Sequence, residues 1–95
     1  MPWRGWQWLW KRRPIRRPEV VLYTRQSCPL CDEAKTFLEV EKRRGRITLS
    51  IQEVDGSPEL QSQWGDWVPV VVVDGRVRFR GRIQPVLWRR LLRDW

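Results

Sequence analysis

The 95-residue sequence predicts an α/β domain built on a four-stranded mixed sheet. Short β-branched apolar runs alternate with segments of helical period, the pattern of chains that fold as strand, helix, strand. Near the end, two strand-like runs flank Asp74-Gly75, a strong signal for a tight hairpin. The length allows one domain, and no apolar run approaches the ~20 residues that a membrane-spanning helix needs.

The first predicted strand, Val20–Tyr23, is an apolar run that suits a strand buried on both faces. After a polar turn, a helix is expected to begin near Cys28, with Pro29 in the first turn, where its missing N–H costs nothing. Charge marks both ends of this helix, and Gly45 lies just beyond it. The charged residues are Asp32 and Glu33 at the start and Lys42, Arg43 and Arg44 at the end.

The same patterns predict the later elements. They are a strand with alternating Ile47, Leu49 and Ile51, a short helix opened by Ser57-Pro58, a strand over Val68–Val73, a strand over Arg76–Arg80, and a last helix from Pro85. The crossing helix makes the first two strands parallel, and the hairpin makes the last two antiparallel. We expect Trp64 in the core, the three arginines of 76–80 on one face of an edge strand, and Leu87 on the apolar line of the last helix.

Cys28 and Cys31 are the two cysteines of the chain, and they stand at the expected helix start. Unpaired N–H groups and the helix macrodipole favour a thiolate there, and the thiolate is the reactive species. A zinc site needs four protein ligands, or three and a water, and the chain has no His and no third Cys. We therefore expect no metal. A structural disulfide or two unreactive thiols remain as alternatives to thiol–disulfide exchange.

Residues 1–18 differ from the rest, so we expect a disordered or peripheral extension there and a domain over residues 19–95. The extension holds six basic and no acidic residues, together with four tryptophans, within a chain of net charge +8. Its aromatic and basic residues, over 3–17, suit contact with an anionic membrane surface. They also suit single-stranded nucleic acid, but the domain itself is only mildly basic, and we do not expect that partner. The order of charged and apolar residues is not that of a secretory signal.

The sequence around the cysteines resembles the glutaredoxin-like family of the thioredoxin superfamily. Residues 22–25 lead into Cys28-Pro29-Leu30-Cys31-Asp32-Glu33-Ala34, which is similar to the family's C-x-L-C-D-E-A signature. About forty residues later, Trp67-Val68-Pro69 and the following valines are similar to the family's Val-Pro strand and hairpin. The resemblance covers roughly residues 19–93 and implies a thioredoxin-like fold.

The resemblance also implies roles for site residues. Cys28 would be the nucleophile, Cys31 the resolving thiol, and Pro69 a cis residue that turns the Val68 backbone towards a substrate. The other expected substrate contacts are Arg25, which could hold the thiolate or a substrate carboxylate, Leu30 and Trp67. Residues 81–84, Gly81-Arg82-Ile83-Gln84, depart from the pattern that usually holds glutathione, as do Leu30 and Trp67. That departure argues against glutathione as the reductant.

These observations predict a thiol–disulfide oxidoreductase without a bound cofactor. Its substrate would be a disulfide-containing protein or a small thiol, and an external reductant, glutathione or a thioredoxin-type system, would restore it. Two cysteines and no secretory signal favour the cytoplasm, with peripheral membrane contact through the tail. The alternative is a non-enzymatic adaptor of thioredoxin fold that its basic, tryptophan-rich tail docks on a membrane or an acidic partner.

Overall fold

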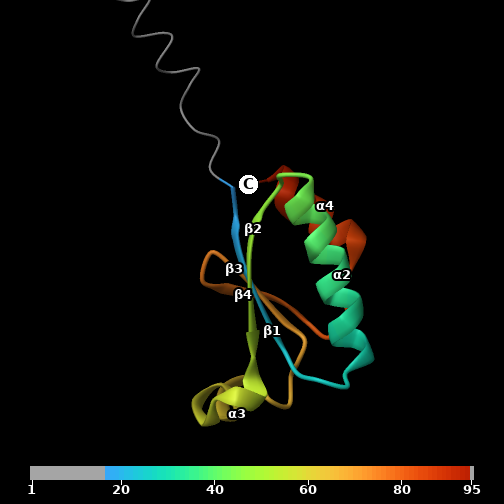
Figure 1. Ribbon diagram of the computed structural model, residues 1–95. Coiled ribbons are helices and arrows are strands. Elements are labelled where there is room, and N and C mark those ends of the chain that lie inside the picture. Colours follow the sequence, from blue (N-terminus) through green and yellow to red (C-terminus); the bar gives the residue numbers. More distant parts are fainter. Residues whose placement is uncertain (1–16, 95) are drawn as a thin grey trace, which may run out of the picture.

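The computed structural model describes residues 17–94 (Figure 1). The expectations for residues 1–16 and for Trp95 lie outside this range. In chain order the elements are β1 (Glu19–Thr24), α2 (Pro29–Arg43), β2 (Thr48–Glu53), the 3-10 turn η1 (Val54–Gly56), α3 (Pro58–Trp64), β3 (Val70–Val73), β4 (Arg76–Arg80) and α4 (Pro85–Arg93). Proline opens each of the three α-helices, at the position where a missing N–H leaves no hydrogen bond unmade.

The four strands form one mixed sheet in the order β2-β1-β3-β4. β1 and β2 are parallel, and β3 runs antiparallel to both β1 and β4. Asp74 and Gly75, both with positive φ, make the hairpin between β3 and β4. The fold class predicted from the sequence, α/β with a four-stranded mixed sheet, is confirmed.

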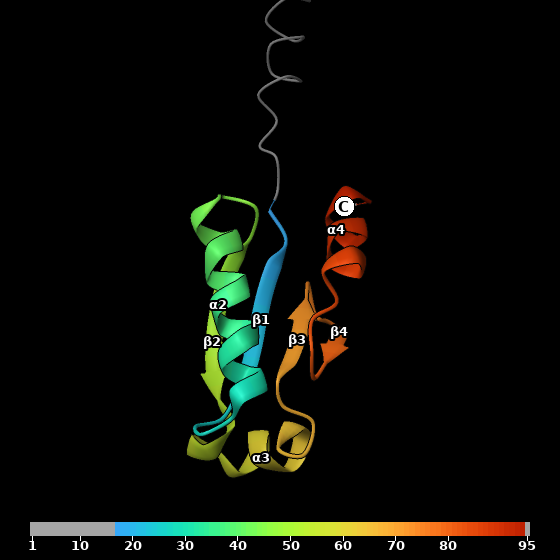
Figure 2. The ribbon, with the colours of Figure 1, turned by 90° about the vertical axis from the view of Figure 1, so that its right-hand side faces the viewer.

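Helices α2 and α4 cover one side of the sheet, and α3 lies at one end of the molecule (Figures 1 and 2). The main core fills the space between the sheet and these two helices. Trp88 of α4 is its largest member and is 1% exposed, with Phe37 and Phe79 packed edge-on or tilted against its ring. This arrangement packs α4 against the middle of α2.

A buried carboxylate joins the two helices at the far end of α2. Glu41 is 5% exposed, and it accepts a hydrogen bond of 2.7 Å from Trp88 Nε1 and one of 2.9 Å from Arg46. A buried charge needs such partners to offset its desolvation. The pair therefore holds α4 and the turn before β2 onto α2.

Two expectations were wrong, one for the edge strand β4 and one for helix α4. A register shift between Val71 and Val72 interrupts the pairing of β3 with β4, so Val73 faces Arg76 while Val70 faces Arg80. Paired residues share a face, whereas residues an odd number of positions apart along a strand lie on opposite faces. Val70 and Val73 are three positions apart, so Arg76 and Arg80 lie on opposite faces. In α4, Leu87 is 50% exposed, and the neighbouring Trp88 takes the core position.

Candidate active site

The turn between β1 and α2 places Cys28 at the head of the helix. Ser27 has φ of 56°, in the left-handed region, and Cys28 returns to extended backbone as the N-cap of α2. Cys28 Sγ accepts a hydrogen bond of 3.2 Å from the backbone N–H of Cys31. A sulfur atom thus occupies the capping position that a Ser or Asp oxygen usually fills.

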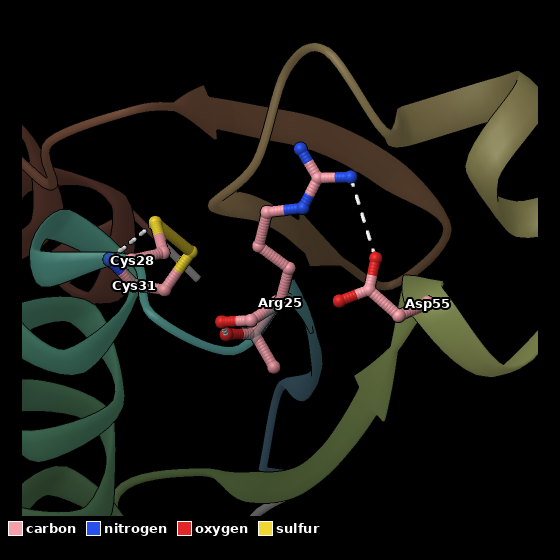
Figure 3. The surroundings of a disulfide bond; sticks show 5 residues. Arg25, Cys28, Cys31 and Asp55 are labelled. Carbon is pink, nitrogen blue, oxygen red and sulfur yellow. Dashed lines mark hydrogen bonds and ion pairs between the residues drawn. A yellow bond between two sulfur atoms is a disulfide. The ribbon is translucent and has the colours of Figure 1, made fainter.

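The two cysteines form a disulfide, and their Cα atoms are 5.1 Å apart (Figure 3). Their surroundings differ sharply, because Cys31 is fully buried whereas Cys28 is partly exposed. A thiol from outside can therefore reach Cys28 and not Cys31. This is the asymmetry that separates an attacking sulfur from a resolving one.

Arg25 lies close to the cysteines in sequence, but its guanidinium group points to a different partner. Its Nη2 lies 3.3 Å from Asp55 Oδ1, and both side chains are partly exposed (Figure 3). Asp55 belongs to η1, and no sequence pattern pointed to it. The expected contact of Arg25 with a thiolate or a substrate carboxylate stays a prediction.

The acidic residues after Cys31 are exposed to solvent, which weakens their effect on the sulfur atoms. Glu33 also pairs with Arg82 at 3.6 Å, across the gap between α2 and the loop before α4. Sequence reasoning missed this use of Arg82. The signal was its position between Gly81 and Pro85, in the segment that departs from the glutathione-binding pattern.

The loop before β3 has the cis Val68–Pro69 bond that the resemblance implied. Pro69 is buried, and its carbonyl accepts a hydrogen bond of 2.7 Å from Gly81 N–H, so the ends of the loop and of β4 are joined. Trp67, by contrast, is 53% exposed, and the Arg80 guanidinium lies 5.0 Å from its ring centroid. The Trp67 ring is thus an exposed aromatic surface that makes a cation–π contact with Arg80.

Trp64 was expected in the core, and Leu30 was expected to contact the substrate, which stays a prediction. Trp64 is only partly buried, and it stacks on Tyr23 with ring centroids 5.3 Å apart, outside the main core. Leu30 is 37% exposed beside the cysteines, and it forms one wall of a hollow of about 240 Å³. The other lining residues are Glu33, Ala34, Phe37, Arg82, Ile83 and Pro85.

Over residues 17–94, no three His, Cys, Asp or Glu side chains come together in a way that could hold a metal ion. No helix in the same range is long and apolar enough to cross a membrane.

A four-stranded mixed sheet, three helices and a Cys-x-x-Cys pair at a helix start define the thioredoxin-like class. The family model described as a glutaredoxin-like domain (DUF836) matches residues 19–92. The chain belongs to this glutaredoxin-like family, as the C-x-L-C-D-E-A motif indicated.

Relatives and solved structures agree with this assignment. An uncharacterised protein of Mycobacterium tuberculosis is 35% identical over 67 residues, which are 65% of this chain and 69% of that protein. A protein of Nitrosomonas europaea solved by NMR has a TM-score of 0.68 at 21% identity, covering 82% of this chain and 94% of that one. Oxidised mitochondrial thioredoxin 3 of Saccharomyces cerevisiae has a TM-score of 0.57 at 16% identity, covering 95% and 90%. At these identities the solved structures show the fold alone.

Proposed function

We propose that this protein is a thiol–disulfide oxidoreductase that works through Cys28 and Cys31. The observation that carries the proposal is the unequal burial of the two cysteine residues at the start of α2. A structural disulfide gains nothing from leaving one sulfur atom accessible, and across so short a loop it stabilises a fold little. A dithiol that exchanges disulfides needs that accessibility.

In the reducing direction, the Cys28 thiolate attacks one sulfur atom of a substrate disulfide. A mixed disulfide forms, and the second substrate sulfur leaves as a thiolate that takes up a proton. The Cys31 thiolate then attacks Cys28 Sγ, which releases the first substrate sulfur and closes the Cys28–Cys31 disulfide. Two electrons have passed to the substrate, and an external dithiol or two glutathione molecules return them.

The start of α2 supplies the electrostatics for these steps. The N–H of Cys31 points at Cys28 Sγ, and the α2 dipole adds partial positive charge at the same place. Both favour the thiolate of Cys28, which serves as attacking group in the first step and as leaving group when the protein is reduced. Arg25 is held at Asp55 and would add to this effect only by changing partner.

The substrate side of the proposal rests on the residues predicted to contact a substrate bound at Cys28. The Trp67 ring offers an exposed apolar surface, the Val68 backbone precedes the buried Pro69, and Leu30 borders a hollow next to the disulfide. Such surroundings suit an extended, partly apolar segment that carries a disulfide. We therefore propose a protein disulfide as the substrate, and a cytoplasmic glutathione or thioredoxin-type system as the reductant.

Reduction of insulin or hydroxyethyl disulfide by the full chain, coupled to a reductase system, tests the proposal. We expect turnover with the parent chain and none with Cys28→Ser. An adaptor of the same fold would show no turnover above the uncatalysed rate, and would keep any partner binding in Cys28→Ser. If the parent chain and Cys28→Ser both reduced the disulfide only at the uncatalysed rate, the proposed redox function would be overturned.

A further inference from the structure

Charge is separated along the length of α2. Cys28 stands at its start, and the helix ends in Lys42 and Arg43, fifteen residues and about 22 Å away at the rise of an α-helix. Figure 2 shows α3 at the end where α2 begins, and the start of β1 with the last turn of α4 at the opposite end. We call the end where α2 begins the thiol end. Its acidic residues are Asp32, Glu33, Glu53, Asp55, Glu59 and Asp66, and the arginines among them, Arg25 and Arg82, are paired with Asp55 and Glu33, while Arg80 lies over the Trp67 ring.

The opposite end gathers cations from three parts of the chain. Arg44 and Arg46 follow α2, and a Cβ placed on Gly45 would lie 3.9 Å from a guanidinium nitrogen of Arg17, which precedes β1. The last turn of α4 adds Arg90 and Arg93. We define the cationic end by the residues Arg17, Lys42, Arg43, Arg44, Arg46, Arg90 and Arg93. All seven residues are exposed.

The carboxylates near this end include Glu39, which shares a hollow with Lys42 and Arg43, and the exposed Glu19, but most of the cations make no ion pair with them within residues 17–94. Glu41 is buried and accepts from Arg46 and Trp88, Asp74 accepts from the Glu19 backbone, and Asp94 lies 3.8 Å from Arg93. Within residues 17–94, Lys42, Arg43 and Arg44 make no ion pair. The helix macrodipole accounts for cations in the last turn of α2, but it does not account for Arg44 and Arg17 beyond that turn.

We propose that the cationic end docks on an anionic lipid bilayer and holds Cys28 on the side of the protein that faces away from the membrane. Lys and Arg side chains at such a surface attract acidic phospholipid headgroups. The segment that continues from Arg17 towards the N-terminus adds five more basic residues and four tryptophans within sixteen positions. Interleaved Trp and basic side chains suit the boundary between headgroups and acyl chains.

The tryptophans of the segment before Arg17 suit either a lipid surface or a single-stranded nucleic acid, but the described part of the cationic end fits a lipid surface better. Binding of single strands needs aromatic rings beside the cations on which bases can stack. Among the described residues, the exposed ring is Trp67, and it lies with Arg80 near the thiol end. The cationic end itself offers charge spread over two helix ends and a turn. Such a spread suits many headgroups in one plane.

The test measures partitioning of the full, reduced chain onto phosphatidylcholine vesicles with and without one third phosphatidylglycerol. We expect binding to the anionic vesicles alone. The variant Lys42→Gln/Arg43→Gln/Arg44→Gln should bind on the order of 100-fold more weakly, since each cation at an anionic surface strengthens binding roughly fivefold. The matched control is Arg78→Gln/Arg80→Gln/Arg82→Gln, which removes the same charge from the β4 side and should lose far less.

A second readout tests the orientation. Alkylation of Cys28 by a bulky, water-soluble maleimide should proceed at the same rate with and without anionic vesicles. Protection of Cys28 by the vesicles would overturn the orientation. Three results would overturn the docking surface. They are equal losses of vesicle binding in the two triple variants, no vesicle binding by the parent chain, and tighter binding to a single-stranded oligonucleotide than to the vesicles. None of these readouts depends on disulfide turnover, so this proposal and the redox function fail separately.

Discussion

The two ends of α2 use the same kinds of residue in opposite ways. At its first turn, Glu33 pairs with Arg82 in solvent at 3.6 Å, and the residue Cys28 at the head of the helix is partly exposed. Near its last turn, Glu41 is buried and held by Trp88 and Arg46. The difference teaches that one end of the helix fastens the fold, while the other is left accessible for chemistry.

The largest effect should come from breaking the fastened end. Glu41→Ala leaves the Trp88 N–H buried without its acceptor and Arg46 without its partner, so we expect a loss of about 3 kcal/mol in the free energy of unfolding. Urea unfolding with an unchanged m-value measures it. Glu41→Gln keeps an acceptor for Trp88 and should lose clearly less. Equal losses in the two variants would mean that the packing around the side chain, and not the hydrogen bonds, joins α4 to α2.

At the accessible end, Trp67→Ala should change substrate use and leave the fold intact. The ring is half in solvent, so the free energy of unfolding should change by less than ~0.5 kcal/mol. Loss of one substrate contact of about 1 kcal/mol would lower kcat/KM for a protein disulfide roughly fivefold. Hydroxyethyl disulfide, too small to span the site, should react as before. An equal loss with both substrates would show that Trp67 acts on the cysteines and not on the substrate.

The exposed pair at the first turn should contribute little to stability. Glu33→Ala and Arg82→Gln should each change the free energy of unfolding by less than about 1 kcal/mol, because solvent screens the pair. Urea unfolding under the same conditions measures these losses, so that they can be compared directly with the loss in Glu41→Ala. A loss at Glu33 as large as that at Glu41 would remove the distinction between the two ends of the helix.

The smallest effect concerns pH and α3, which leads into the Trp67 loop. The backbone N–H of Glu59, and then the Ser57 hydroxyl at 3.0 Å, lower the pKa of the Glu59 carboxyl. A carboxyl whose pKa is lowered by folding stabilises the protein above its unfolded pKa, and this contribution is lost as the pH falls through the folded pKa. Glu59→Gln should therefore flatten the acid side of the stability curve slightly. The pH dependence of the melting temperature, compared with the parent chain, checks it.

Local patterns predicted the fold well because local physics sets it. Pro29, the basic last turn and Gly45 bound α2, and Asp74-Gly75 makes the hairpin. Contacts between distant residues were beyond prediction. Glu41 and Trp88 are 47 positions apart, and Arg25 and Asp55 are 30 apart. The register shift in β4 also went unseen, because a bulge adds one residue without changing the residue types that suggest alternation.

The site was predicted in outline and not in its contacts. Two cysteines at a helix start follow from the order of strand, turn and helix, but their unequal burial depends on the tertiary packing of the folded chain. Likewise, charge alone could not tell that Arg25 faces Asp55 or that Arg82 faces Glu33. The folded geometry determines which charged side chains come close together at the surface.

Trapping of a mixed disulfide tests most directly the claim that the accessible end of α2 performs the exchange. Cys31→Ser, mixed with an excess of a peptide disulfide and quenched in acid, should carry one peptide on Cys28, identified by mass spectrometry. Cys28→Ser should carry none, because Cys31 is fully buried. Equal trapping on Cys31 in Cys28→Ser, or no trapping in either variant, would contradict the assignment of attacking and resolving thiols.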